Sequence, residues 1–178
     1  MEQIKRIDRQ LVANGSIIDY YHDIMLLPDG KTVPFDLIDH KGAAAVVPVL
    51  DDGRLVMVKQ YRNALERVTI EIPAGGLNGR EEPTIEAAKR ELSEETGYCS
   101  DNLELLLSIK TTVAFCNEKI DIYVAKDLKP GKQHLDEDEF VEFEAFTVDE
   151  LVDMIFECKI QDSKTIAAVL AYKEKYLK

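Results

Sequence analysis

Three glutamates stand close together in the middle of the chain: Glu91, Glu94 and Glu95. On an α-helix, residues three and four positions apart share one face, so these carboxylates would project together. Like charges at this spacing repel one another, and the negative end of the helix dipole lies nearby. A divalent cation with oxygen ligands removes both penalties. The stretch therefore predicts a metal site, with a solvated acidic helix face as the alternative.

The residues around these carboxylates predict a helix that follows a tight glycine-rich corner. Pro83 suits the first turn of the helix, and Glu82 suits its positive N-terminus. Gly97 suits the left-handed position that ends a helix. Just before the helix, Ala74 or Gly75 could add a backbone carbonyl oxygen to a metal site.

The rest of the pattern predicts strands on both sides of this helix, with a turn at residues 28–30. Thr147 opens a capping box for a helix over residues 151–158, and Asp162 or Ser163 caps a third helix. Strands, hairpins and interspersed helices indicate a mixed α/β or α+β sandwich. The expected strands cover residues 16–27, 32–38, 42–50, 55–61, 69–73, 103–112, 119–125 and 139–146.

Composition narrows the classes of function. The 178 residues are 46% apolar, enough for a packed core, and the net charge of -12 opposes binding to a nucleic-acid backbone. No apolar run approaches the length of a membrane span, and residues 1–8 are too charged for a signal peptide. We therefore expect a cytoplasmic protein that binds neither nucleic acid nor membrane. Three widely spaced cysteines indicate free thiols, not a zinc site: Cys99, Cys116 and Cys158.

The full constellation is more specific than the carboxylates alone. It reads Gly76, five residues, Glu82, seven residues, Arg90-Glu91, two residues, Glu94-Glu95, one residue and Gly97. This stretch resembles the signature of the Nudix hydrolases at every defined residue. Gln60-Tyr-Arg62, the stretch Glu71–Gly75, the acidic loop at 135–140 and the Asp162–Thr165 helix start are similar to the ADP-ribose pyrophosphatase branch of that family.

The resemblance implies a fold and a reaction. The fold is the Nudix α/β/α sandwich around a mixed β-sheet, preceded by an N-terminal antiparallel β-hairpin. The reaction is metal-dependent hydrolysis of a nucleoside diphosphate linked to another moiety, with ADP-ribose giving AMP and ribose 5-phosphate as the leading case. The implied cofactor is Mg²⁺ or Mn²⁺, in two or three ions per site.

The resemblance also implies roles for individual residues. The metal ligands would be Glu91, Glu94 and Glu95, completed by a carbonyl at Ala74 or Gly75. Glu82 and Arg90 would brace the corner against the helix, with Gly76 and Gly97 as motif glycines. Arg90 and Glu94 would also belong to the catalytic set.

Water activation and substrate binding are expected from other parts of the chain. By resemblance, a glutamate in the loop before the last strand would activate or orient the attacking water, and that loop offers Glu137 and Glu139. Arg62 would hold a phosphate, or else make an ordinary salt bridge. Glu71 and Gly76 are expected beside Arg62 at the substrate.

The resemblance further implies two parts of the chain and a dimer. Residues 1–41 would form strands for dimerisation and substrate cover, and residues 42–178 the hydrolase domain. Tyr20, Tyr21 and Phe35 could pack a nucleobase, or belong to an ordinary hairpin core. We expect a homodimer.

Two departures from the branch leave the substrate open. Residues 112–115 read Thr-Val-Ala-Phe where Ser-Pro-Gly-Phe is usual, and residues 33–36 read Val-Pro-Phe-Asp without the usual arginine. Another sugar nucleotide, such as GDP-mannose, is therefore an alternative substrate. A nucleotide-sensing module without catalysis is the other alternative, although the three intact glutamates favour an enzyme.

Overall fold

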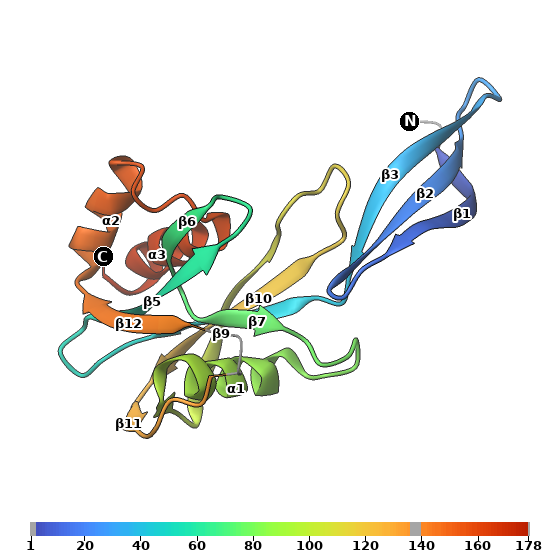
Figure 1. Ribbon diagram of the computed structural model, residues 1–178. Coiled ribbons are helices and arrows are strands. Elements are labelled where there is room, and N and C mark those ends of the chain that lie inside the picture. Colours follow the sequence, from blue (N-terminus) through green and yellow to red (C-terminus); the bar gives the residue numbers. More distant parts are fainter. Residues whose placement is uncertain (1–2, 136–139, 178) are drawn as a thin grey trace. The chain divides into compact units, whose positions relative to one another are not determined.

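The computed structural model describes residues 3–135 and 140–177, which fall into two compact units (Figure 1). The first unit contains the chain up to Gly42 together with Lys110–Lys119. The second unit contains Ala43–Ile109 and Ile120–Lys178. A segment from the middle of the chain thus belongs with the N-terminal strands.

The first unit is built on a three-stranded antiparallel sheet of β1 (Lys5–Asn14), β2 (Ile18–Leu26) and β3 (Thr32–His40). The sequence predicted the β2–β3 hairpin and its turn, where Gly30 has a φ of 82°. It did not predict β1, whose charged and apolar residues are all exposed and so show no buried face. The guanidinium of Arg9 donates to both carboxylate oxygens of Asp23, at 2.6 and 2.8 Å, across the β1–β2 pair.

Residues 110–119 are hydrogen-bonded to the end of β3. The Ile38 amide donates to the Phe115 carbonyl at 2.6 Å, and the Asn117 amide donates to the Ile38 carbonyl at 3.2 Å. The Asn117 side chain also accepts from the His40 amide at 2.8 Å. These bonds explain why the segment groups with the N-terminal strands.

Among its described residues, the second unit contains two larger sheets, a short two-stranded sheet and three helices. One sheet has the order β7-β4-β10-β9, with β10 parallel and β7 antiparallel to β4; the other has the order β12-β5-β6. The strands are β4 (Ala43–Pro48), β5 (Leu55–Arg62), β6 (Arg67–Glu71), β7 (Ala74–Gly76), β9 (Asn102–Lys110), β10 (Lys119–Lys126) and β12 (Val141–Phe146), with a short pair of β8 (Tyr98–Cys99) and β11 (Lys129–Pro130). The helices are α1 (Thr84–Thr96), α2 (Val148–Phe156) and α3 (Ser163–Tyr176).

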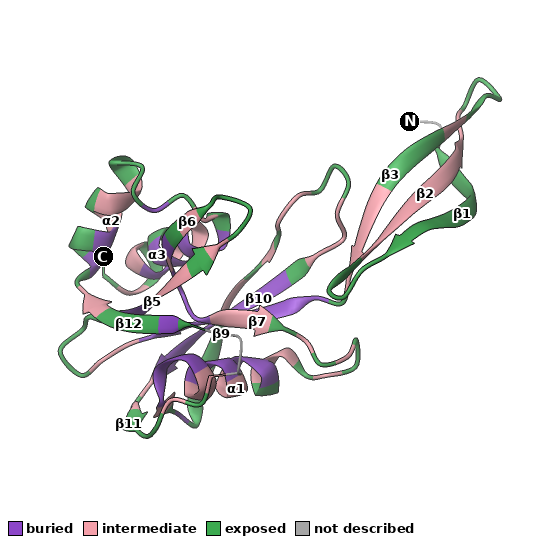
Figure 2. Cartoon of the chain, in the orientation of Figure 1, coloured by how far each residue is buried: buried purple, intermediate pink, exposed green. Residues whose placement is uncertain are grey.

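The core lies in this second unit. A large apolar cluster includes Val47, Met57 and Ile122 from the strands and Leu151 and Val169 from α2 and α3. Smaller clusters pack α1 against β4. Figure 2 shows buried residues in α1, α3 and the strands of this unit. Burying this apolar surface is the main stabilising term, and it fixes α1 on the sheet that carries β7.

The predicted fold class is confirmed: the chain is a mixed α+β structure with helices packed on mixed sheets. The capping box at Thr147 is present, and the helix begins at Val148, three residues before the predicted start. Asp162 caps α3 through its side chain. Within the described residues, no helix combines the length and the apolar character that a membrane crossing requires.

Candidate active site

The glycine-rich corner places β7 directly against α1. The Glu95 carboxylate accepts a hydrogen bond from the Ala74 amide at 3.0 Å. The Glu91 carboxylate lies over Gly75, so that a Cβ at this position would be only 2.1 Å from Glu91 Oε1. Two of the three predicted metal ligands, Glu91 and Glu95, therefore contact Gly75 and Ala74, either of which was expected to supply the carbonyl ligand.

The three carboxylates differ in their exposure. Glu91 and Glu95 are 7% and 3% exposed, on the same face of α1 as the core residues Ala88 and Leu92. The Glu94 side chain is 37% exposed. A buried carboxylate loses its hydration and needs a compensating partner, so this face is not the solvated acidic surface considered as the alternative.

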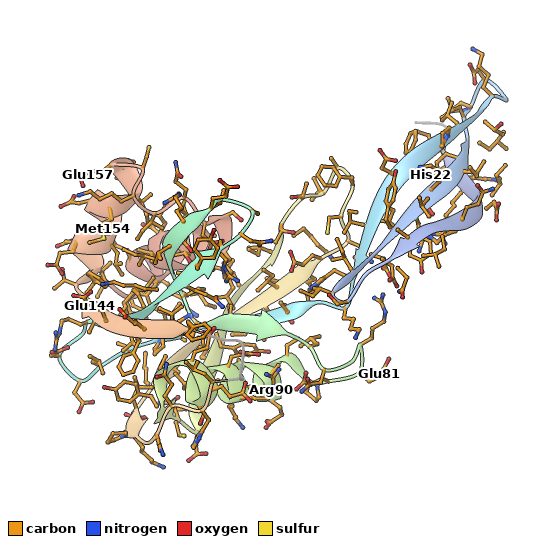
Figure 3. The ribbon with its side chains drawn as sticks, in the orientation of Figure 1. His22, Glu81, Arg90, Glu144, Met154 and Glu157 are labelled. Atoms are coloured by element: carbon orange, nitrogen blue, oxygen red, sulfur yellow. The ribbon has the colours of Figure 1, made fainter. Side chains whose placement is uncertain are left out.

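Arg90, labelled at α1 in Figure 3, supplies part of that compensation and ties the corner to the helix. Its Nη1 donates to Glu91 at 2.6 Å and to Glu94 at 3.0 Å, and its Nη2 donates to the Gly76 carbonyl at 3.0 Å. Burial alone would lower the pKa of Arg90, but the charges of Glu91 and Glu94 raise it above its ordinary value. Its Nε lies 3.6 Å from Glu82 and is, within the described ranges, the buried side-chain nitrogen that lacks a hydrogen bond.

Glu82 organises the loop that precedes the helix. Its carboxylate accepts from the Asn78 amide at 2.6 Å and faces Arg90 from the other side. Pro83 occupies the N-cap, one position before the predicted first turn, with a ψ of 125°. The extended N-cap conformation lets the proline ring stand outside the helical hydrogen bonds, which explains the difference of one residue.

The C-terminal end of α1 is held by a segment that the sequence did not single out. Gly97 has a φ of 73° and closes the helix as predicted, with its amide donating to the Ser93 carbonyl at 3.0 Å. The His134 amide donates to the Glu94 carbonyl at 3.0 Å, and Gln133 Nε2 donates to the Glu95 carbonyl at 2.6 Å. Otherwise unsatisfied carbonyls at the helix end are thereby paired.

Arg62 and Glu71 form an ion pair in which Glu71 is buried and Arg62 is partly exposed. The guanidinium donates to both carboxylate oxygens, from Nε at 2.8 Å and from Nη2 at 2.7 Å. The salt bridge considered for Arg62 is therefore present, and its partner, Glu71, is one of the two other residues predicted at the substrate. The hydrogen bond to Glu71 raises the pKa of Arg62 against the opposing effect of burial, and the charge of Glu95 raises it further, so Glu95 lies within electrostatic reach.

Further donors hold Glu71 in its ionised form. Thr69 Oγ1 donates to it at 2.6 Å, and the Lys164 ammonium at the start of α3 donates to Oε2. Burial alone would raise the pKa of Glu71, but the bond from Arg62 and the charge and bond of Lys164 lower it to about 2. Lys164 lies in the Asp162–Thr165 stretch that resembles the branch, but it was not itself predicted as a site residue. Its contact with Glu71 spans 93 residues and so leaves no local spacing to detect.

The donor set suits a hard divalent cation. Carboxylates and backbone carbonyls are oxygen ligands that suit Mg²⁺. Because Gly75 has no side chain, the Glu91 carboxylate can lie directly against the backbone of the corner. Among the described residues, however, no three His, Cys, Asp or Glu side chains converge on one point as they stand. In this arrangement the carboxylates of Glu91 and Glu94 are both paired with the guanidinium of Arg90. Glu137 and Glu139, the predicted water-activating candidates, lie outside the described residues.

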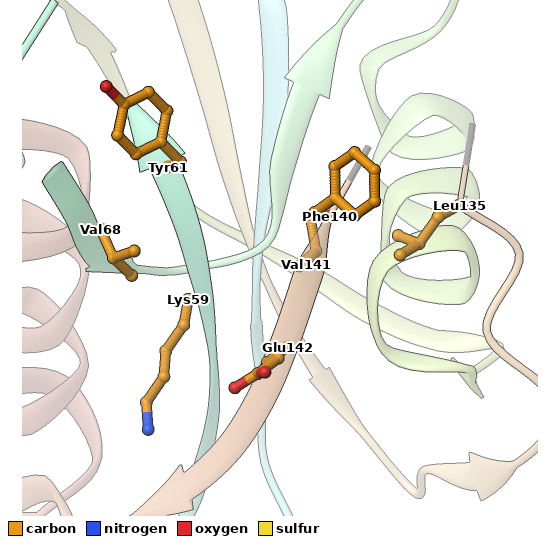
Figure 4. A pocket seen from close by; sticks show the side chains of 7 residues that line it. All are labelled: Lys59, Tyr61, Val68, Leu135, Phe140, Val141 and Glu142. Carbon is orange, nitrogen blue, oxygen red and sulfur yellow. The ribbon is translucent and has the colours of Figure 1, made fainter. Parts of the chain in front are cut away.

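A groove of about 460 Å³ lies on the sheet of β12, β5 and β6 (Figure 4). Tyr61, Val68 and Phe140 give it exposed apolar walls. Because successive strand residues face opposite sides, Tyr61 points away from the face that carries Arg62. Glu91, Glu94 and Glu95 are not among the residues that line the groove.

Comparisons with known proteins find one family model, several relatives and a similar fold. The family model described as the NUDIX domain matches residues 39–169. A methanol dehydrogenase activator of Bacillus methanolicus is 42% identical, and an ADP-ribose pyrophosphatase of Bacillus subtilis is 38% identical. Each of these alignments covers 93% of this chain and 90% of the relative. A crystal structure of an ADP compounds hydrolase matches 98% of this chain and 94% of its own with a TM-score of 0.85; its 21% identity shows the fold alone.

Proposed function

This chain belongs to the Nudix family and is a pyrophosphate-bond hydrolase, and from that premise we propose that its substrate is ADP-ribose, cleaved to AMP and ribose 5-phosphate with a divalent metal ion. The observation that carries the proposal is the contact of Glu91 and Glu95 with Gly75 and Ala74, which brings the signature glutamates to the backbone corner. The 38% identity to a relative named ADP-ribose pyrophosphatase supports the choice of substrate.

The metal ions would be held by Glu91, Glu94 and Glu95, with a carbonyl of Ala74 or Gly75. When bound, Mg²⁺ or Mn²⁺ would neutralise charge on the pyrophosphate and acidify a bound water, and two or three ions would serve one site. Arg90, through its bonds to Glu91, Glu94 and the Gly76 carbonyl, would keep the ligands and the corner in register.

The remaining roles fall to residues outside the helix. Arg62 would contact a phosphate of the substrate with the part of its guanidinium that is not bonded to Glu71; its side chain is 39% exposed. Glu71 would fix the direction of that guanidinium. Glu137 or Glu139 would orient the attacking water. Gln133 and His134 support this assignment, because they fasten the chain just before that loop to the end of α1.

Another sugar nucleotide, such as GDP-mannose, is the alternative within the same chemistry. It is favoured by the sequences at residues 33–36 and 112–115, which lack the arginine and the proline usual in the branch. A second candidate function, activation of a methanol dehydrogenase, is favoured by the 42% identity to a relative of that name. One protein could have both functions, because the chain retains the three signature glutamates that hydrolysis would need.

We also propose a homodimer in which a second copy covers the first unit. Of the described residues up to Lys41, none is buried, and β1 is exposed along its whole length. Yet the unit carries many apolar side chains, among them Ile7, Leu11, Ile17 and Phe35. A three-stranded sheet with no buried face is marginal by itself, and exposed apolar patches of this kind mark interfaces.

The function is tested by measuring phosphomonoester release from a panel of ADP-ribose, GDP-mannose and dinucleoside polyphosphates with Mg²⁺ or Mn²⁺. We expect ADP-ribose to be turned over fastest, and EDTA to abolish turnover. Faster turnover of another sugar nucleotide would replace the substrate, and turnover that persists in EDTA would refute the metal dependence. A separate assay adds the protein to a methanol dehydrogenase and measures alcohol oxidation.

A further inference from the structure

Beyond the signature helix, a second set of buried charges joins the start of α3 to the end of β6. Its centre is Glu71, whose side chain is 3% exposed and accepts from Arg62, Thr69 and Lys164. The Lys164 side chain is 10% exposed and also donates to Asp162 at 3.0 Å. Burying an ammonium costs hydration free energy, so a lysine here needs a reason that a simple helix cap does not supply.

The same helix start is bonded to the backbone that leads into the active-site corner. Thr165 Oγ1 accepts from the Ile72 amide at 2.9 Å, and Asp162 accepts from the Thr165 amide and hydroxyl at 2.9 and 2.6 Å. Two residues after Ile72, the Ala74 amide donates to Glu95. A path of hydrogen bonds therefore runs from α3 through the backbone of residues 72–74, which follow β6, to a signature glutamate.

Arg62 is the member of this set that can reach a ligand. Both bonds to Glu71 use Nε and Nη2, a fork that fixes the plane of the guanidinium. If Glu71 rotated or became protonated, that fork would open. Lys164 opposes both by placing a positive charge on Oε2, the oxygen that also accepts from Arg62 Nη2.

We propose that Lys164 is a positioning residue for the hydrolysis, acting through Glu71 to hold Arg62 in the orientation that binds a phosphate of the substrate. This inference rests on the proposed function in assigning Arg62 to a phosphate. Lys164 itself contacts no substrate. A structural lysine would affect only folding, whereas a positioning lysine affects substrate affinity through Arg62 alone.

The first test is a double-mutant cycle on the full chain with ADP-ribose and Mg²⁺. Lys164→Met should raise KM roughly tenfold or more with a smaller change in kcat, as is typical of residues that orient a contacting group. In an Arg62→Met background, Lys164→Met should change KM less than about twofold, because the two residues act as one unit. Lys173→Met, which removes an exposed ion pair to Asp149 on the same helix, is the matched control and should leave KM unchanged.

The second test does not need activity. The Arg62 Nε–H, bonded to a buried carboxylate, should give a slowly exchanging NMR signal, assigned by its loss in Arg62→Lys. Lys164→Met should shift or broaden that signal, and Lys173→Met should not. If Lys164→Met does not fold, Lys164→Gln, which keeps a donor but no charge, takes its place in both tests.

The outcomes separate the two proposals. Effects of Lys164 and Arg62 on KM that simply multiply, or an unshifted Arg62 signal with wild-type KM in Lys164→Met, would overturn the positioning role. If the wild type hydrolyses no substrate on the panel, the proposed function fails, and the NMR signal alone decides whether Lys164 positions Arg62.

Discussion

The carboxylate of Glu91 occupies the space that a side chain at Gly75 would need, with Oε1 2.1 Å from the ideal Cβ position. The glycine is therefore required by a side chain sixteen residues further along the chain. Its own φ is not in the left-handed region, so the requirement is one of space and not of backbone conformation. This contact explains why the corner and the helix form a single site.

Gly75→Ala should reduce turnover by about a hundredfold, since displacing a reactive group by about 1 Å can cost that much. The added methyl group must push Glu91 away from β7, while the core beneath α1 is unchanged. Steady-state kinetics and thermal unfolding would be measured together. Gly79→Ala, where a Cβ meets nothing within 4 Å, is the matched control. Equal activity of the two variants would contradict the assignment of Glu91 to the site.

Glu95→Gln should lower kcat by at least about a hundredfold, because losing one carboxylate removes several kcal/mol of charge stabilisation from a metal site. The amide oxygen of Gln can still accept from the Ala74 amide, so the unfolding temperature should change little. Calorimetric titration with Mn²⁺ should show weaker binding. Glu86→Gln, on the exposed face of the same helix, should behave like the wild type in all three measurements.

Glu71 should contribute stability that is lost in acid. Its pKa is lowered in the folded state from 4.5 to about 2, so the unfolded chain takes up the proton first as the pH falls. The contribution is complete above about pH 5.5, and about 1.4 kcal/mol of it is lost by pH 3.5. In Glu71→Gln this term is absent, so the difference in unfolding free energy between wild type and variant should shrink by that amount.

Urea unfolding at pH 7 and pH 3.5 measures this difference. A gap between wild type and Glu71→Gln that stays constant across the two pH values would mean that Glu71 is not held ionised by Arg62 and Lys164. Glu144→Gln, which breaks an exposed pair with Lys59, serves as the comparison for an ordinary surface carboxylate.

If β1 lies at the proposed dimer interface, negative charges introduced on this strand should prevent dimerisation. Ile7→Asp combined with Leu11→Asp should convert the protein to a monomer, since both side chains are more than half exposed on β1 and would face the second copy. Sedimentation velocity at micromolar concentration gives the mass. Leu177→Asp, a similar change at the end of α3, should leave a dimer. A wild-type protein that sediments as a monomer would refute the proposal.

The signature could be read from the sequence because its residues lie within 22 positions of one another on a corner and a helix. The position of Gly97 after the helical residues predicted that it ends the helix, and the structure confirms this prediction. Pro83 differed by one position, because proline fits both the N-cap and the first turn. The roles of the signature residues in metal binding and catalysis stay predictions.

What the sequence did not reveal depends on contacts between distant segments. Lys164 meets Glu71 across 93 residues, and Gln133 meets Glu95 across 38. Glu71 and Lys164 each lie in a stretch that resembles the branch, but no periodicity or spacing in a single sequence marks either contact as a pair. Strand β1 was missed for another reason: with no buried face, it lacks the apolar alternation by which strands are found.

The bond between Lys164 and Glu71 has a consequence for the nascent chain. During synthesis the signature helix leaves the ribosome long before α3 does, and domains acquire their structure as units. Until residues 162–165 emerge, Glu71 lacks its ammonium partner and the Ile72 amide lacks the Thr165 hydroxyl. A ribosome-bound chain that already carries every signature residue would therefore hold an unfinished site until α3 has emerged.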